Sequence, residues 1–327
     1  MSVLVTGGAG FIGSVAVERL LAAGEPVVVL DNLSKGFRAA VEPAAAFVEG
    51  AIQDTDAVRR VLAEHRVDTV MHFAASIAVG ESCTDPASYF ENNVVGALSV
   101  LRAMVDSGTK HFILSSTAAV YGDPEAVPIT EEMTPRPINP YGLSKRMIEQ
   151  ALEWYGRAYG LRSVCLRYFN ACGATDRHGE AHQPETHLVP LVILAATGER
   201  ECVTVFGRNY DTPDGTCIRD YIHIADLADA HLLAMRYLRE GGSSEIVNLG
   251  NSVGHSVLEI IRSVERVTGK TVPVEYGERR PGDADRLVAS SEKARRTLGW
   301  TPRRGDIDTI VQDAWNWRRS HPQGYGA

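Results

Sequence analysis

The stretch SVLVTGGAGFIGSVAVERL, residues 2–20, decides the fold of this 327-residue chain. Its first part, SVLVT, is short, rich in valine and followed by glycine, which is typical of a buried parallel strand. A turn with Gly7, Gly10 and Gly13 then leads into a helical pattern that ends near Gly24. Glycines let a backbone approach a pyrophosphate, and the N-terminus of a helix offers unpaired N–H groups to an anion. This strand–turn–helix unit predicts a dinucleotide-binding site.

The next segment, EPVVVLDN, reads as a second strand that ends at Asp31. A carboxylate at this position can accept hydrogen bonds from the ribose of an adenosine, and it would repel a 2′-phosphate. We therefore expect NAD rather than NADP as the cofactor. Arg38 lies further on in a loop and is interpreted as a solvated charge.

Strand and helix patterns continue to alternate up to about residue 170. Strands are expected at AFVEG, VDTVMHFAA, KHFILSS and RSVCLRYFN, with helices at residues 54–65, about 87–105 and about 141–159. This alternation predicts an α/β fold with a doubly wound parallel sheet of the Rossmann type. The rhythm breaks afterwards, so we expect an NAD-binding domain at 1–170 and a smaller C-terminal α/β substrate domain at 171–327. The segment EIVNLGN, residues 245–251, is expected to return to the edge of the first domain.

Composition excludes several classes of partner. The formal net charge of -8 disfavours nucleic acid and anionic membranes, and no apolar run approaches the length of a membrane span. The five cysteines form no C-x-x-C pair, which favours reduced thiols, and MSVLVTGG enters a strand at once, with no room for a leader. We therefore expect a cytoplasmic protein.

Tyr141 and Lys145 form a Y-x-x-x-K pattern at the start of a predicted helix. Four residues apart, both side chains lie on one helical face. Lowering the pKa of a phenol from about 10 to about 7 takes about 4 kcal/mol, whereas a lysine cation about 6 Å away supplies roughly 2.8 kcal/mol. The positive nicotinamide of NAD⁺ and a hydrogen bond would supply the rest, so we predict that Tyr141 is a catalytic base only in the oxidised holoenzyme. The alternative is a surface tyrosine beside a solvated lysine.

The stretch KHFILSSTAAVYG provides a partner for the phenol. Ser115, Ser116 and Thr117 leave the carboxyl end of a predicted strand, where ligands bind in open α/β sheets. Thr117 is the candidate for a hydroxyl that bridges the substrate oxygen and Tyr141. The alternative interpretation is that these residues only end the strand.

At this point the chain resembles the extended short-chain dehydrogenase/reductase family, and within it the UDP-glucose 4-epimerases. The resemblance covers nearly the full length. It depends on TGGAGFIGS, HFAASIAVGES, ENNVVG, SSTAAVYG, NPYGLSK, RYFNACGA, ETHLVPLV, DGTCIRDYIHIADLA and RRPGDADRLVAS. The resemblance implies an NAD-dependent 4-epimerisation of a UDP-hexose through a transient 4-keto sugar.

The resemblance also implies roles for individual residues. Tyr141 is the base, Lys145 holds the nicotinamide ribose and Thr117 orients the sugar. The implied cofactor-binding residues are Gly7, Gly10, Phe11, Ile12, Gly13, Asp31, Asn32, Ser34, Ala51, Ile52, Phe73, Ala74, Ala75, Asn92, Ser115, Tyr141, Lys145, Tyr168 and Phe169. The implied substrate-binding residues are Thr117, Asn170, His187, Leu188, Val205, Phe206, Arg219, Tyr221, Arg280, Asp283 and Leu287.

Ala118 and Ala119 narrow the reaction. Relatives that dehydrate a sugar place Asp-Glu after the threonine, and decarboxylating relatives typically keep a glutamate in this stretch. Two methyl groups cannot transfer protons, so oxidation at C4 and return of the hydride remain. UDP-N-acetylglucosamine, UDP-pentose and UDP-uronate stay open as substrates, and a non-catalytic NAD-binding regulator is the alternative of another class.

The sequence leads to three further expectations, on substrate tolerance, metal binding and dimerisation. Leu287 stands where a tyrosine restricts some members to plain hexoses, so the tolerance for N-acetyl sugars stays open. His178, His182 and His187 fit no compact zinc pattern and no cysteine joins them, so no metal is expected. Homodimerisation through the helices at about 87–105 and 142–159 is implied by the resemblance.

Overall fold

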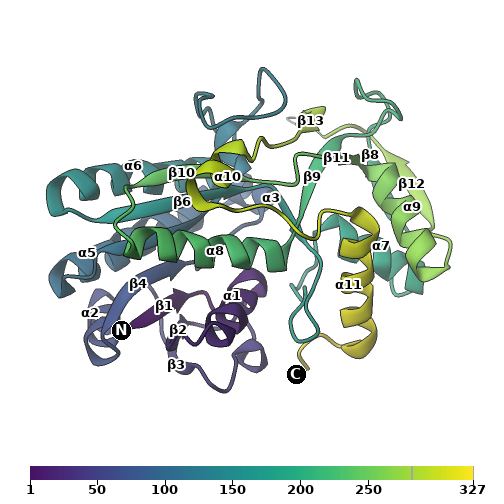
Figure 1. The fold of residues 1–327 in the computed structure, drawn as a ribbon. Coiled ribbons are helices and arrows are strands. Elements are labelled where there is room, and N and C mark those ends of the chain that lie inside the picture. Colours follow the sequence, from purple (N-terminus) through teal and green to yellow (C-terminus); the bar gives the residue numbers. More distant parts are fainter. Residues whose placement is uncertain (281–282, 327) are drawn as a thin grey trace.

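Seven parallel strands form the central sheet of the computed structural model, which describes residues 1–280 and 283–326. Pro281 and Gly282 of the motif RRPGDADRLVAS, and Ala327 at the end of the second predicted domain, lie outside the described residues. The strands follow the spatial order β10-β6-β5-β4-β1-β2-β3 (Figure 1). Their bounds are β1 Ser2–Thr6, β2 Val27–Asp31, β3 Ala46–Glu49, β4 Val67–His72, β5 His111–Thr117, β6 Arg162–Tyr168 and β10 Glu245–Leu249. The chain order reverses between β1 and β4, and open α/β sheets bind ligands at such a switch point.

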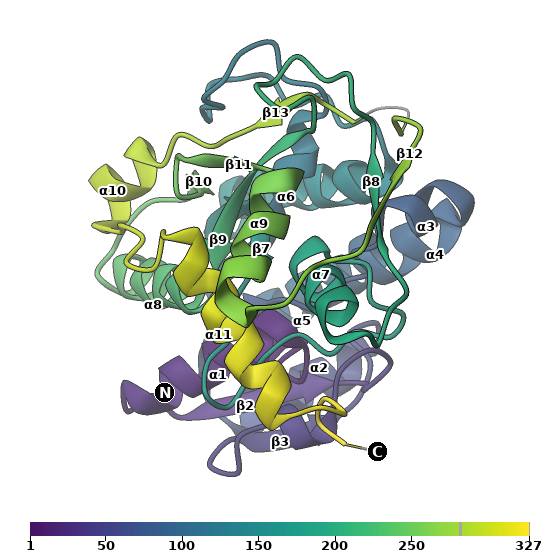
Figure 2. The same cartoon turned by 90° about the vertical axis from the view of Figure 1, so that its right-hand side faces the viewer.

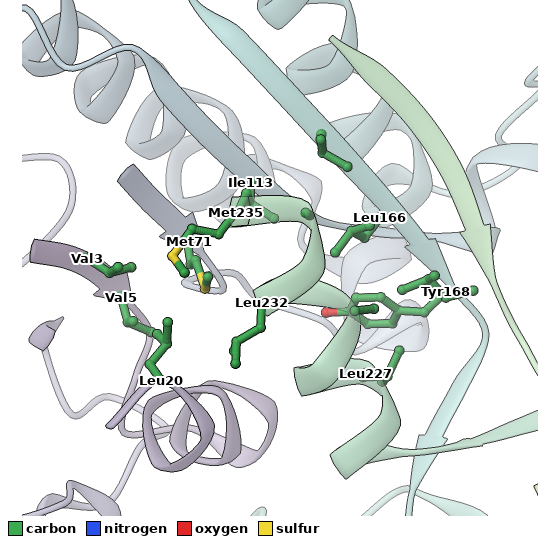
Figure 3. Close-up of a cluster of buried hydrophobic side chains, with 14 of the residues drawn as sticks. Val3, Val5, Leu20, Met71, Ile113, Leu166, Tyr168, Leu227, Leu232 and Met235 are labelled. Atoms are coloured by element: carbon green, nitrogen blue, oxygen red, sulfur yellow. The ribbon is translucent and has the colours of Figure 1, made fainter. Parts of the chain in front are cut away.

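Helices cover both faces of this sheet because its strands are apolar on both sides. Val3 and Val5 of β1 belong to one buried cluster, together with residues of α1 (Phe11–Ala22) and α8 (Ile224–Arg239). Leu4 points to the opposite face, with α2 (Thr55–Glu64), α5 (Gly96–Ser107) and α6 (Pro140–Tyr159). Figure 3 shows the first cluster, in which Leu20 of α1 and Leu232 of α8 approach the strands. The period of two along β1 thus builds two cores, one on each side.

The helix expected at about 87–105 consists of three consecutive pieces. The structure has α4 (Pro86–Tyr89), a π-helical segment η2 (Phe90–Val95) and then α5. The π-turn carries Asn92 and Asn93, and π-bulges occur frequently at functional sites. Three other short helices each follow a strand of the large sheet: η1 (Arg38–Ala40) follows β2, α3 (Val79–Thr84) follows β4 and η3 (Ala118–Tyr121) follows β5.

Smaller sheets and three packed helices form the other side of the molecule (Figure 2). Strand β9 pairs with β7, β11 and β13, and β8 pairs in parallel with β12. A third buried cluster joins these strands to the helices α7, α9 and α11. The bounds are β7 Asn170–Cys172, α7 Leu188–Thr197, β8 Val203–Phe206, β9 Ile218–His223, β11 Gly254–Ser256, α9 Val257–Thr268, β12 Val274–Gly277, β13 Arg286–Leu287, α10 Glu292–Leu298 and α11 Ile307–Ser320. This α/β arrangement confirms the predicted fold class.

The chain crosses between the two sides more than once. Strand β10 is the edge strand beside β6, and α8 and α10 also pack on the large sheet. After α11 the tail returns to the first unit, where the ring centroids of Tyr325 and Phe37 lie 5.4 Å apart (Figure 1, Figure 2). A division at residues 170/171 therefore stays a prediction. Within residues 1–280 and 283–326, no helix combines the length and apolarity that crossing a membrane requires.

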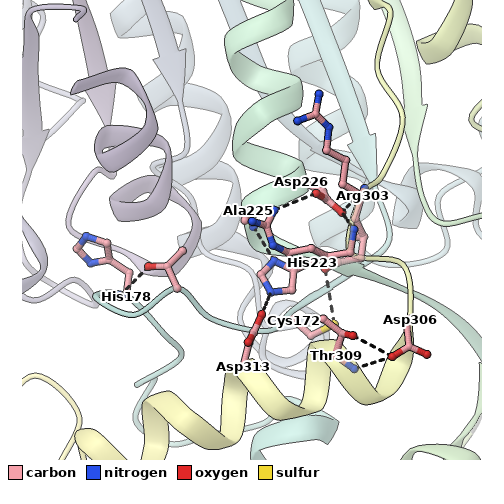
Figure 4. A network of polar contacts seen from close by, with 12 residues as sticks. Cys172, His178, His223, Ala225, Asp226, Arg303, Asp306, Thr309 and Asp313 are labelled. Atoms are coloured by element: carbon pink, nitrogen blue, oxygen red, sulfur yellow. Dashed lines mark hydrogen bonds and ion pairs between the residues drawn. The ribbon is translucent and has the colours of Figure 1, made fainter. Parts of the chain in front are cut away.

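Buried polar groups at the start of α8 connect this helix to α11 and to the loop that precedes α11 (Figure 4). The Asp226 carboxylate accepts hydrogen bonds from the backbone N–H groups of Arg303 and Arg304 at 2.9 and 2.8 Å. His223, which caps α8 through Nδ1, lies with Nε2 3.2 Å from Asp313 of α11. Because Asp226 and His223 are buried, their hydrogen bonds fix the position of α11 against α8.

Candidate active site

A cavity of about 1530 Å³ opens at the carboxyl edge of the large sheet and is lined by residues from both sides of the molecule. It gathers most of the residues that the sequence nominates. The lining includes Gly7, Gly10, Phe11, Ile12, Gly13, Asp31, Asn32, Ser34, Ile52, Phe73, Ala74, Ala75, Asn92, Ser115, Thr117, Tyr141, Tyr168, Phe169, Asn170, His187, Leu188, Phe206, Arg219, Tyr221 and Arg280.

Five nominated residues do not line the cavity: Ala51, Lys145, Val205, Asp283 and Leu287. Val205 points into the core of the second side, because side chains alternate along β8 and Phe206 takes the cavity side. Leu287 packs against the small apolar cluster that contains Tyr121 and Phe169. Lys145 and Asp283 contact residues of the wall, namely Ser115 for the lysine and Arg219 and Arg280 for the carboxylate.

The first turn of α1 forms a cradle that fits a pyrophosphate. Gly10 is the N-cap, and no side chain caps the first N–H groups of the helix. Gly7 has a φ of +73°, and a Cβ there would lie 2.5 Å from the backbone nitrogen of Ala74. A Cβ on Gly13 would lie 2.2 Å from the Gly7 carbonyl oxygen. Only glycine permits this close approach of turn, helix and neighbouring strand, and the residues of the first helical turn line the cavity.

Asp31 anchors the second side of this cradle. Its carboxylate accepts hydrogen bonds from the N–H groups of Ala9 at 3.0 Å and Leu33 at 2.8 Å. Each oxygen keeps a second lone pair, and the side chain lines the cavity, so ribose hydroxyls can still donate to it. The donor set and the cradle therefore fit NAD. Lys35, which sequence reasoning passed over, lines the same end of the cavity.

Tyr141 and Thr117 meet on the cavity wall. Tyr141 lies in the first turn of α6, which Asn139 caps by accepting a hydrogen bond from Gly142 N–H at 2.8 Å. Thr117 is the last residue of β5, and its hydroxyl also accepts from Ala119 N–H at 3.1 Å. Burial raises the pKa of Tyr141, and a hydrogen bond with Thr117 partly offsets this effect. In the chain by itself the phenol is thus a weaker acid than free tyrosine, and its role as a base stays a prediction.

Lys145 lies just behind the wall. Its Nζ donates a hydrogen bond to the Ser115 carbonyl at 2.8 Å, and the Ser115 hydroxyl is hydrogen-bonded to Tyr168. Burial lowers the pKa of Lys145 to about 8, against the opposing effect of the Glu149 carboxylate. The lysine charge is therefore easily lost, and Glu149 is a group that helps to retain it.

Sequence reasoning missed two positioning residues. Asn93, the residue after the nominated Asn92, is fully buried and donates to the Ser144 hydroxyl at 3.0 Å and to the Ser76 carbonyl at 3.0 Å. Glu149 accepts from the Ser116 hydroxyl at 2.7 Å. A second amide in ENNVVG, and a glutamate one turn after Lys145, were the available signals.

Two arginines lie at the other end of the cavity. Arg219 and Arg280 both line it, and Asp283 lies beside both, 3.5 Å from Arg219 Nη2 and 2.8 Å from Arg280 Nε. The guanidinium of Arg280 lies 5.0 Å from the centroid of the Phe206 ring. Two planar cations next to an exposed aromatic ring suit a diphosphate joined to a base, because guanidinium pairs with phosphate oxygens and the ring can stack. In a chain of net charge -8 this local cation pair stands out.

A phenol, a hydroxyl and a buried ammonium at the edge of a Rossmann sheet define an NAD-dependent enzyme of the short-chain dehydrogenase/reductase type. Residues 3–250 match the NAD dependent epimerase/dehydratase family. The chain belongs to this family, in its UDP-glucose 4-epimerase branch.

Curated relatives and solved structures agree over the full length. The chain is 51% identical to UDP-glucose 4-epimerase of Streptococcus mutans over 99% of both chains, and 49% identical to that of Lacticaseibacillus casei over 100% of this chain and 99% of the relative. A crystal structure of a UDP-glucose 4-epimerase matches with a TM-score of 0.98 at 48% identity over 100% of both chains. The Brucella ovis enzyme in complex with NAD matches with a TM-score of 0.94 at 47% identity over 96% of this chain and 97% of that one. The resemblance seen in the sequence is confirmed.

Proposed function

We propose that this chain is an NAD-dependent isomerase that interconverts UDP-glucose and UDP-galactose. Bound NAD⁺ would accept the hydride from C4 of the hexose, and its reduced form would return it. Tyr141 takes the proton from the C4 hydroxyl and gives it back, while Thr117 hydrogen-bonds the same oxygen and orients it. The observation on which this proposal depends is that Tyr141 and Thr117 line the same cavity as the glycine cradle.

The groups around the catalytic pair support isomerisation over elimination. Ala118 and Ala119 begin the short helix η3 directly after Thr117, where an eliminating enzyme needs an acid and a base. Their methyl groups cannot exchange protons, so the keto sugar can only be reduced again. At the other end, we propose that Arg219 and Arg280 bind the diphosphate and that Phe206 contacts the uracil, leaving the hexose free to present either face.

The proposal is tested by adding UDP-galactose to the purified enzyme and measuring UDP-glucose without any added reductant. Tyr141→Phe removes only the phenolic oxygen, so we expect kcat to fall by roughly 10²–10⁴-fold. Tyr159→Phe, on the exposed end of the same helix, is the matched control and keeps wild-type activity. Stoichiometric release of NADH, or a 4-keto-6-deoxy product, would overturn the proposal.

We also propose that the active form is a homodimer in the cytoplasm. Leu143, Met147 and Trp154 are exposed along α6, and their spacing of four and seven residues places them on one helical face. An exposed apolar stripe of this kind is typical of an interaction surface. The five cysteines are free thiols, which fits a reducing compartment.

A further inference from the structure

Three side chains from the loop before α7 converge at the wall of the cavity. Glu180, His182 and His187 each offer one ligand atom, and these atoms lie within 4.8 Å of one another. Glu180 Oε1 lies 2.5 Å from His182 Nδ1, and Glu180 Oε2 lies 3.5 Å from His187 Nδ1. The centroids of the two imidazole rings are 5.6 Å apart. One carboxylate and two imidazoles form a donor set that Zn²⁺ takes in proteins.

The Glu180 carboxylate has an unsatisfied oxygen aimed at this point. The side chain is only 7% exposed, and its Oε2 is buried without a hydrogen-bond partner. A buried carboxylate oxygen that accepts no hydrogen bond costs free energy, and such groups in folded proteins require an explanation. A cation between Oε2 and the two Nδ1 atoms would satisfy it.

The charges of the loop also favour a bound cation. Glu185, at 12% exposure, lies 2.8 Å from His187 Nδ1, so two poorly solvated carboxylates face the same pair of rings. In the part of the chain that the structure describes, only histidines lie within ion-pair distance of Glu180 and Glu185. One divalent cation would balance the two carboxylate charges.

We propose that Glu180, His182 and His187 bind one divalent transition-metal ion of the Zn²⁺ type. Ligand atoms of a tetrahedral zinc with bonds of about 2.0–2.1 Å lie about 3.3 Å apart, so the observed cluster reaches this geometry by small side-chain movements. All three residues line the cavity, which leaves the fourth position open to water from that side. The ion would tie the loop to the N-terminus of α7, whose first residue is Leu188. This is a role in loop positioning, and the hydride and proton transfers do not involve it.

The test uses the full-length protein without an affinity tag. Bound metal is removed with a chelator, the chelator is removed by gel filtration, and Co²⁺ is titrated while its visible absorption is recorded. We expect a sharp end point at one Co²⁺ per chain and displacement of the Co²⁺ by Zn²⁺. A titration of the wild-type protein without such an end point overturns the proposal by itself.

Variants assign the site. We expect Glu180→Gln and His182→Gln each to weaken Co²⁺ binding at least tenfold. His255→Gln, at a partly buried histidine on β11 outside the cluster, is the matched control and should bind as tightly as the wild type. Circular dichroism confirms that each variant is folded before titration. Equal affinity in all three variants would show that Co²⁺ binds elsewhere and would overturn the assignment.

Discussion

At the residue scale, the proposed base and the lysine beside it occupy different environments. Tyr141 and Thr117 reach the cavity, whereas Lys145 is behind its wall, bonded to the backbone at the end of β5. Burial raises the pKa of the phenol and lowers that of the lysine, so in the chain alone both groups favour their uncharged forms. A bound nicotinamide cation would shift the phenol in the opposite direction. We therefore expect proton abstraction by Tyr141 only in the oxidised state of the cofactor.

The lysine makes a prediction about stability. With a pKa of about 8 in the folded chain against 10.5 as the ordinary value, the unfolded chain binds more protons between these two pH values. The free energy of unfolding should therefore rise with pH in this window, by about 2–3 kcal/mol from pH 7 to pH 10 for this group. Lys145→Met should lack this rise. Urea unfolding of cofactor-free wild type and variant measures the difference, and equal pH slopes would contradict the assignment.

At the element scale, α6 and β6 are locked together by a buried ion pair. Arg167 donates to both oxygens of Glu149 at 2.8 and 2.6 Å, and the two side chains are 2% and 0% exposed. The Arg167 guanidinium also donates to the Tyr121 hydroxyl at 2.9 Å. The pair therefore fixes the helix that carries Tyr141 and Lys145 against the strand that precedes the cavity.

Glu149→Gln should cost about 3–5 kcal/mol of unfolding free energy, because it leaves the Arg167 charge buried without its counter-ion. Glu153→Gln is the matched control on the same helix. Its partner Arg157 is 61% exposed, so the loss should be within about 1 kcal/mol. Chemical denaturation of both variants at pH 7 measures the difference. Similar losses of unfolding free energy in the two variants would show that the buried pair stabilises the fold no more than the exposed pair does.

The same elements show how far the sequence predicts the structure. Strand residues such as Val3, Leu4 and Val5 are apolar without interruption, and this local pattern correctly predicts the doubly wound sheet. Glycine spacing likewise identifies the cradle on α1. The contact of Glu149 with Arg167 joins two elements through tertiary packing, and no local pattern encodes it. Glu180 is similar: the histidines were visible in the sequence, but the carboxylate that joins them is apparent only when the loop is folded.

At the scale of the whole molecule, the cavity lies between parts that the chain visits repeatedly. A division at 170/171 places α8 in the second part, yet α8 packs on the first sheet, and β10, within the segment expected to return, lies at the edge of that sheet beside β6. The sequence did not predict the position of α8, because its periodic pattern shows an apolar face but does not show which sheet covers that face. Residues from both parts line the cavity, so elements of both can hold a sugar nucleotide and a cofactor side by side.

The outer face of the molecule carries the last prediction. Trp154 on α6 is 65% exposed, and Leu143 and Met147 lie on the same face, so burial against a second copy would remove a large apolar area from water. Trp154→Glu places a charge in this stripe and should convert the proposed dimer to a monomer in size-exclusion chromatography with light scattering. Val253→Glu, at an apolar side chain that is 55% exposed in a loop, is the matched control and should leave the dimer intact. A Trp154→Glu protein that stays dimeric at micromolar concentration would place the interface on another surface.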